Sequence, residues 1–302
     1  MATLLQRANS LSAPSKKAPP ATQLALAAIV LWASLATLGV SLSHVPPFLL
    51  TGLALLIGSL LALPLSGFRL AQWRVPLKTL LLGVYGLFGF HFLLFLALRN
   101  APALQANLVN YLWPLLMVLL APVFLPQLTW RAAHVLAAIL GFAGAAVVIL
   151  GDAPTMGAGG NAWGYVSALG SAFIWASYSL WTQRVAAFPN AAIGSFALVS
   201  GLLSLLCHAL IEPATSLNLH DWMRITLMGL GPMGAAFFLW DQALKTGDAR
   251  HIGILSYLTP LLSTALLLLV NGKTLSWPVA LAALMIVGAA VLGTRQAGSN
   301  RS

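Results

Sequence analysis

The stretch Tyr111–Leu116 reads Tyr-Leu-Trp-Pro-Leu-Leu, and it returns 146 positions later, where Tyr257–Leu262 reads Tyr-Leu-Thr-Pro-Leu-Leu. Two further pairs of short matches keep nearly the same spacing, 143 and 144 positions: Trp32–Ser34 with Trp175–Ser177, and Gly144–Val147 with Gly288–Val291. Three matches in one order at nearly one offset indicate an internal duplication. In a membrane protein, such a duplication is typical of a transport pathway built between two related halves.

The composition predicts a membrane protein. Of the 302 residues, 60% are hydrophobic and only 7% are charged, whereas a soluble domain carries about 25% charged residues. The mean hydropathy is +0.91. The net charge of +10 comes from 15 Lys and Arg against 5 Asp and Glu. Because these basic residues form no long run, we expect the lipid bilayer as a partner and no nucleic acid.

The apolar segments predict an all-α membrane protein with ten transmembrane helices. A span needs about 20 apolar residues, and short polar connections separate ten candidates. The predicted spans are 21–43, 46–66, 75–98, 102–125, 130–150, 161–184, 190–211, 222–245, 249–270 and 276–295.

The basic residues predict the orientation of these spans. With the N-terminus inside, 12 basic residues are cytoplasmic and 3 are external, in agreement with the positive-inside rule. The 12 are Arg7, Lys16, Lys17, Arg69, Arg74, Lys78, Arg131, Arg184, Lys245, Arg250, Arg295 and Arg301, and the 3 are Arg99, Arg224 and Lys273. Both termini are then cytoplasmic. Each half has five spans, an odd number, so we predict two inverted five-helix repeats.

Four segments follow from this count. Residues 1–20 are polar, contain no signal-peptide pattern and predict a disordered cytoplasmic tail. The first five-helix repeat is predicted at 21–151 and the second, inverted repeat at 160–295. Residues 296–302 form a second cytoplasmic tail.

Two ionisable side chains lie well inside predicted spans, where polarity is costly. His91 is near the middle of the third span and is either a helix-packing hydrogen bond or a substrate contact or proton relay. Asp241 lies in the eighth span, four residues before Lys245, so the two share a helical face. Asp241 is either an interfacial ion pair with Lys245 or a gating or coupling carboxylate.

Pro114 and Pro260 occupy matching positions in the fourth and ninth spans. A proline inside a helix frees the carbonyl four residues back, which here belongs to Asn110 and Ser256. Matching helix interruptions in two halves point to a transporter's binding site. The alternative is that both prolines are simple kinks.

Aromatic and polar side chains surround these prolines. Asn107 and Tyr111 share a helical face with Pro114, and Ser171, Trp175, Tyr178 and Thr182 form a similar stripe. Trp113, Trp240 and Tyr257 also lie inside spans, deeper than the interface where Trp and Tyr usually gather. Each of them could be packing alone, but together they predict a pocket that stacks a ring.

The sequence lacks the signatures of other functions. It has no metal-protease motif, no phosphate-binding loop and no serine-hydrolase elbow. We therefore expect no enzyme, no cofactor and no bound metal. A passive channel is disfavoured, because no ring of charges or carbonyl filter is present.

The chain resembles the drug/metabolite transporter superfamily, EamA-type, over residues 21–295. The likeness rests on Trp-Ala-Ser in the first helix of each half and Tyr-Leu-x-Pro-Leu-Leu in the fourth. Further likeness, at Gly89–Phe92, Asn107–Pro114 and Phe173–Tyr178, is to the aromatic amino-acid exporters of bacterial inner membranes. The resemblance implies that His91, Trp113 and Trp175 line a central cavity beside Tyr111, and that the substrates are aromatic and other amino acids and hydrophobic toxic compounds.

The leading hypothesis is a monomeric, multi-pass secondary transporter of the bacterial inner membrane. It would export small-molecule substrates, namely aromatic and other amino acids, by alternating access through a midplane cavity. The predicted binding residues are His91, Trp113, Trp175, Tyr111, Tyr178, Asn107, Trp240 and Tyr257, and the helix-break or gating residues are Pro114, Pro260 and Asp241. The alternative is a multidrug or organic-cation exporter of the same fold, because aromatic side chains also suit cations.

Overall fold

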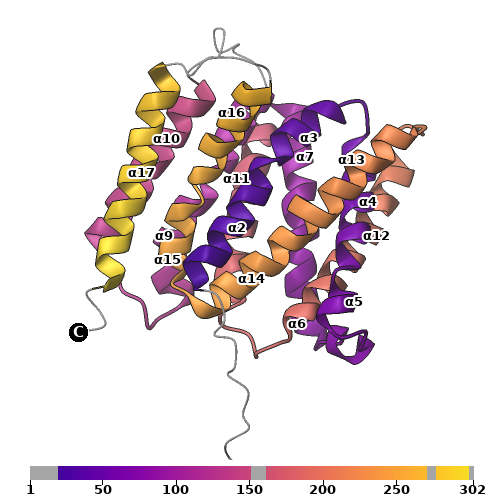
Figure 1. Ribbon diagram of the computed structural model, residues 1–302, viewed down its shortest axis with the longest axis horizontal. Helices are drawn as coiled ribbons and strands as arrows, with labels where there is room; N and C mark the ends of the chain where they lie inside the picture. The colour runs from indigo at the N-terminus through magenta and orange to yellow at the C-terminus, as the bar shows by residue number, and fades with distance from the viewer. Residues whose placement is uncertain (1–19, 151–160, 271–276, 299–302) are drawn as a thin grey trace, which may run out of the picture.

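The structure is a computed structural model that describes residues 20–150, 161–270 and 277–298, and these residues form helices without any β-strand (Figure 1). Most of the two predicted tails, 1–20 and 296–302, lies outside the described residues, as does the connection 151–160. An all-helical protein was expected, since a helix satisfies its own backbone hydrogen bonds in lipid.

Eight helical segments are long and apolar enough to span a membrane, so the chain is a multi-pass membrane protein. They are Ala21–Ser41, Pro47–Leu65, Leu77–Asn100, Ala103–Phe124, Ala132–Leu150, Asn190–Ile211, Leu219–Thr246 and Ala249–Val270. Two of the ten predicted spans are not among them. Ala162–Trp181 is long enough but rich in Ser, Tyr and Trp, and the apolar helix Trp277–Gly293 is shorter.

Large apolar side chains face outward as well as inward. Leu81, Leu136 and Leu284 are all exposed, Leu284 by 70%, whereas alanines such as Ala25, Ala137 and Ala289 are fully buried. Small residues at helix contacts and large apolar residues outside are typical of helices packed in lipid, where close backbone approach replaces hydrophobic collapse.

The first half extends to Leu150. Its helices are α2 (Ala21–Ala33), α3 (Leu35–Ser41), α4 (Pro47–Ser59), α5 (Ala62–Leu65), α6 (Leu77–Val84), α7 (Phe90–Asn100), α8 (Ala103–Asn110), α9 (Trp113–Phe124) and α10 (Ala132–Leu150). A 3₁₀ turn covers Leu70–Trp73, and the π-helical turn Tyr85–Gly89 joins α6 to α7.

The second half begins at α11. Its helices are α11 (Ala162–Trp181), α12 (Ile193–Ile211), α13 (Leu219–Leu230), α14 (Ala236–Thr246), α15 (Ala249–Leu255), α16 (Leu258–Val270) and α17 (Trp277–Gly298). The 3₁₀ turn Asn190–Ala192 precedes α12, and the π-helical turn Gly231–Ala235 joins α13 to α14.

Several elements of the two halves start at positions 146 residues apart, the spacing of the tyrosine-proline motif. The pairs are α4 with α12, the π-helical turn at Tyr85 with the one at Gly231, α7 with α14, and α8 with α15. α7 and α14 also end 146 residues apart, at Asn100 and Thr246. The duplication read from short motifs therefore extends to an irregular local structure, the π-helical turn.

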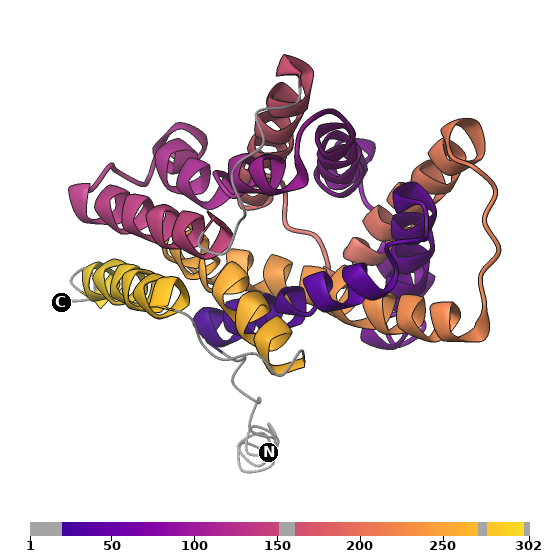
Figure 2. The same cartoon turned by 90° about the horizontal axis from the view of Figure 1, so that it is seen from above.

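The two halves interlock instead of forming separate bodies (Figure 2). The main helix contacts join one element of each half: α10 with α17, α4 with α12, α7 with α11, α2 with α14, and α9 with α15. Any solute that passed between the halves would therefore meet side chains from both.

The first helices of the two halves, α2 and α11, begin beside the ends of α14 and α7, which lie at opposite ends of the bundle (Figure 1). A methyl group at Gly247, just after α14, would lie 2.6 Å from the Cβ of Ala21 at the start of α2. At the start of α11, the Asn161 amide donates to the Asn100 carbonyl at 2.9 Å. We call these two ends of the bundle the Lys245 end and the Arg99 end.

Candidate functional site

Eight rings from both halves are grouped about Trp175, and we call them the aromatic cluster. Its members are Trp32 of α2, Phe90 and His91 of α7, Trp113 of α9, Trp175 and Tyr178 of α11, and Phe237 and Trp240 of α14. Trp175 lies at its centre. Its ring centroid is 5.4 Å from Phe90, 5.8 Å from Trp32 and 6.4 Å from Trp113. These spacings suit edge-to-face and tilted ring pairs.

Hydrogen bonds fix two of the indoles. Trp32 donates from Nε1 to the Pro232 carbonyl at 3.1 Å, and Trp240 donates from Nε1 to the Ser179 hydroxyl at 3.1 Å. Pro232 belongs to the second π-helical turn. A buried indole N–H needs an acceptor, so each indole is held at one edge while its faces remain against other rings.

His91 is held by the first π-helical turn. Its Nδ1 lies 2.6 Å from the Leu87 carbonyl, and because a carbonyl can only accept, Nδ1 carries the proton. In the neutral ring, Nε2 is then an acceptor. The imidazole is buried and lies 6.5 Å from the Phe237 ring of the other half. His91 therefore brings a polar edge to an otherwise apolar group of rings.

The helix interruptions lie just before the two prolines. α8 ends at Asn110 and α9 begins at Trp113, while α15 ends at Leu255 and α16 begins at Leu258. The prediction that Pro260 leaves the Ser256 carbonyl without a partner is wrong. This carbonyl accepts a hydrogen bond from the Thr259 amide at 3.0 Å. The Asn110 side chain instead accepts from the Ser171 hydroxyl at 2.8 Å and links α8 to α11.

Three predicted binding residues lie apart from the aromatic cluster. Asn107 is exposed, and Tyr111 is half-buried at the break between α8 and α9. Tyr257 is fully buried in a different apolar group, with Ala145 of α10 and Ile286 of α17. Pro114 and Pro260 are both buried. The repeat thus gives Tyr111 and Tyr257 matching positions in the chain but different surroundings.

Asp241 adjoins the aromatic cluster with one carboxylate oxygen occupied. It is 2% exposed, and its Oδ2 lies 2.6 Å from Lys245 Nζ. With the Asn190 amide oriented so that its nitrogen donates, that nitrogen is 2.9 Å from the same oxygen. Lys245 also donates to the Phe188 carbonyl at 3.1 Å and lies 3.6 Å from the centre of the Phe188 ring.

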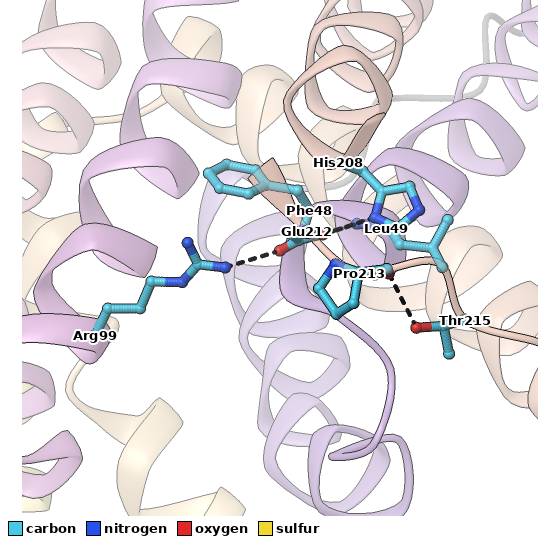
Figure 3. Close-up of polar contacts among 7 residues, drawn as sticks. All are labelled: Phe48, Leu49, Arg99, His208, Glu212, Pro213 and Thr215. Carbon is cyan, nitrogen blue, oxygen red and sulfur yellow. Dashed lines mark hydrogen bonds and ion pairs between the residues drawn. The ribbon is translucent and has the colours of Figure 1, made fainter. Parts of the chain in front are cut away.

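Glu212 forms a second polar group at the Arg99 end (Figure 3). Its two oxygens accept from the backbone amides of Phe48 and Leu49, at 3.0 and 3.1 Å, at the start of α4. His208 Nδ1 lies 3.0 Å away and Arg99 Nη2 3.5 Å away. A carboxylate at a helix N-terminus is favoured by the helix dipole. Glu212 therefore ties α4, α7 and α12 together, and sequence reasoning missed it.

The rings of the aromatic cluster fill the space between them. Each tryptophan, His91, Tyr178 and Phe237 of the cluster is at most 9% exposed. A pocket of about 360 Å³ lies elsewhere, lined by Leu24, Leu61, Pro64, Leu65, Asn190, Ala235, Phe238, Leu239 and Gln242. Among the described residues, no group of three or more His, Cys, Asp or Glu could hold a metal ion.

Known proteins resemble this chain in sequence and in structure. The aromatic amino acid exporter YddG of Ancylobacter novellus is 41% identical over 283 residues, covering 91% of this chain and 96% of that protein. The protein of the same name from Escherichia coli K12 is 30% identical and covers 90% and 96%. A crystal structure of a protein 40% identical superposes with a TM-score of 0.84, covering 91% of this chain and 98% of that chain.

A sequence profile of the EamA-like transporter family matches the chain twice, at residues 20–150 and 162–295. The two matches cover most of the chain, one in each half. The resemblance inferred from the repeated motifs is thereby confirmed. The chain belongs to the EamA-like transporter family.

Proposed function

We propose that the protein is an inner-membrane secondary transporter that exports aromatic and other amino acids. The observation that carries the proposal is the aromatic cluster, which draws rings from α2, α7, α9, α11 and α14. Rings built from both halves suit a flat apolar solute that moves between them. The names of the relatives from Ancylobacter and Escherichia coli support the substrate class.

We further propose ten spans in two inverted five-helix repeats, 21–151 and 160–295, with both termini cytoplasmic. The equal 146-residue spacing of several elements supports the repeat. The opposite starting ends of α2 and α11 support the inversion. The 12 to 3 distribution of basic residues supports a cytoplasmic Lys245 end and an external Arg99 end.

Transport would proceed by alternating access. The rings of the aromatic cluster are in contact in this conformation, so a substrate could enter only if the two halves move apart on one side. Trp113, Trp175, Tyr178 and Trp240 would hold the substrate's apolar side chain, with Tyr111 at the adjoining helix break. His91 and Asn107 would meet its charged ends. Tyr257, beside the second helix break, would also contact the substrate, and Pro114 and Pro260 would allow α8–α9 and α15–α16 to bend.

A flux measurement tests this function. Purified protein in proteoliposomes should take up labelled phenylalanine or threonine above empty vesicles, saturate with concentration, and show counterflow against an excess of unlabelled substrate. Saturation and counterflow would separate a carrier from a channel. Uptake equal to that of empty vesicles for every aromatic amino acid would refute the proposal.

A substitution within the aromatic cluster tests the site. Trp175→Leu keeps an apolar side chain and removes the central ring, so KM for phenylalanine should rise up to about tenfold, the value of one or two ring pairs. Trp163→Leu, on the exposed first turn of the same helix, should leave KM unchanged. Equal KM values in both variants would assign Trp175 to packing.

One observation favours a second candidate function, export of organic cations. Asp241 is buried beside rings that could surround a cation. A growth assay separates the two functions. Protection against quaternary amines, without protection against toxic aromatic amino-acid analogues, would favour the cation exporter.

A further inference from the structure

Among the described residues, two buried carboxylate oxygens accept no hydrogen bond, Asp221 Oδ1 and Asp241 Oδ1. Asp221 Oδ1 lies 3.1 Å from His44 Nε2 in an ion pair. Glu212 accepts from two backbone amides and faces His208 and Arg99. Asp248 bonds Arg250 through both oxygens. Asp241 Oδ1 differs, because among the described residues it has neither a hydrogen-bond donor nor an ion-pair partner; Lys245 reaches only Oδ2. A buried carboxylate oxygen without a donor costs free energy, and a ligand that donates to it would recover that free energy.

Asp241 belongs to the same part of α14 as two rings of the aromatic cluster, Phe237 and Trp240. Asp241 directly follows Trp240 and is four residues after Phe237, which places it on the face of α14 that carries the ring of Phe237. The pocket lined by Ala235, Phe238, Leu239 and Gln242 also includes Asn190, which reaches Asp241 Oδ2, but Asp241 itself does not line it.

The other oxygen is fixed by two donors. Lys245 and Asn190 both reach Oδ2, and Lys245 is also engaged by the carbonyl and ring of Phe188. The carboxylate is thus held in one orientation by groups at the Lys245 end. This arrangement leaves an oriented, negatively charged acceptor next to stacked rings.

We propose that Asp241 Oδ1 accepts a hydrogen bond from the ammonium group of an aromatic amino acid or amine. The inference rests on the proposed function and names Asp241 as the residue that binds the amino group of the substrate. The ligand is a primary ammonium with an aromatic side chain, because an N–H donor satisfies the oxygen while the ring lies against the cluster. Asp241 thereby selects amino-bearing ligands over aromatic carboxylates.

Calorimetric binding to the full-length protein in lipid nanodiscs tests the inference with three ligands. Phenylalanine carries both charged groups, phenethylamine lacks the carboxylate and 3-phenylpropionate lacks the ammonium. Phenylalanine and phenethylamine should bind at least about tenfold more tightly than 3-phenylpropionate, the value of one charge-assisted hydrogen bond. Equal affinity for phenylalanine and 3-phenylpropionate would overturn the proposal.

Substitutions locate the effect. Asp241→Asn should remove the preference for the ammonium ligands, while Asp241→Glu should retain it at weaker affinity. Asp221→Asn is the control, because the Asp221 carboxylate accepts from Asn218 and faces His44 at the start of α13. A preference that survives Asp241→Asn would overturn the proposal. If that variant does not fold, the wild-type ligand comparison and Asp241→Glu still decide it.

This test separates the inference from the proposed function. Flux of phenylalanine without any ammonium preference would refute the inference and leave the exporter. Asp241-dependent binding of phenethylamine without amino-acid flux would refute the exporter and leave the inference.

Discussion

The two halves place a basic residue at the same position, Arg99 near the end of α7 and Lys245 near the end of α14, 146 residues apart. Their carboxylate partners differ. Arg99 faces Glu212 of the other half, whose oxygens are both bonded, whereas Lys245 faces Asp241 on its own helix, which keeps one oxygen free. The same repeat position thus has two roles. At the Arg99 end its basic residue joins the two halves through Glu212, and at the Lys245 end it holds Asp241, which keeps an unpaired oxygen.

The largest expected effect is a loss of stability when Glu212 is replaced, because Glu212 holds helices of both halves together. Glu212→Gln replaces one accepting oxygen with an amide that opposes a backbone N–H, and it leaves His208 and Arg99 without a charged partner. We expect the free energy of unfolding to fall by about 3 kcal/mol. Thermal unfolding in detergent measures the change.

Asp241→Asn is the matched variant for that measurement. Asparagine can still accept from Lys245, which also keeps the Phe188 carbonyl, so the loss of stability should be smaller, about 1 kcal/mol. Equal losses in the two variants would break the comparison, because both carboxylates would then be structural.

A pair of repeat-matched glycines sharpens the comparison on α10 and α17. A methyl group at Gly144 would lie 2.8 Å from Ile286 and 3.1 Å from Met285, whereas at Gly288 the nearest atom is 3.8 Å away. Gly144→Ala should therefore destabilise by about 1–3 kcal/mol. Gly288→Ala should be neutral or slightly stabilising, since alanine favours helix.

The same unfolding assay applies to both glycine variants. A neutral Gly144→Ala would mean that α10 and α17 can separate by a few tenths of an ångström without cost. That outcome would remove the packing difference between the two helices.

The smallest expected effect concerns the corresponding helices α6 and α13. α13 begins with a capping box, in which Asn218 and Asp221 bond each other's backbone amides, while α6 begins after Pro76 without a side-chain cap. Asn218→Ala should cost about 1 kcal/mol. Lys78→Ala, on the exposed first turn of α6, should change stability by less than about 0.5 kcal/mol.

Amide hydrogen exchange at the two helix starts gives an independent readout. Faster exchange confined to the first turn of α13 would agree with loss of its cap. Unchanged exchange and stability in Asn218→Ala would show that helix packing alone holds this end.

Much of the fold could be predicted from the sequence, because the informative signals are local. Apolar length and the repeated motifs predicted helices close to those observed, with α7 inside the predicted span 75–98 except for its last turn. The span count was harder. The serines and aromatic residues that lower the hydropathy of α11 include Trp175 and Tyr178, members of the aromatic cluster. The polar and aromatic side chains that α11 contributes to the site lower its mean hydropathy, and this makes the helix harder to recognise as a membrane span.

The site was less accessible to sequence reasoning. Trp32, Phe90 and Phe237 join the aromatic cluster but were not predicted as site residues, although Trp32 matches Trp175 in the repeated Trp-Ala-Ser. That match was the available signal. Glu212 gave no such signal, because its partners on α4 are more than 160 residues away in the chain. For Tyr257 the repeated motif was misleading. It matches Tyr111 in sequence, but the residues packed around the two tyrosines differ.

The two π-helical turns, Tyr85–Gly89 and Gly231–Ala235, have an evolutionary consequence. Each departs from regular α-helical winding by one inserted residue, and one residue turns a helix by about 100°. Both turns hold a ring of the aromatic cluster, His91 on the Leu87 carbonyl and Trp32 on the Pro232 carbonyl. Their 146-residue spacing is that of the repeated tyrosine-proline motif, so duplication of a single unit that already carried the insertion would account for both turns.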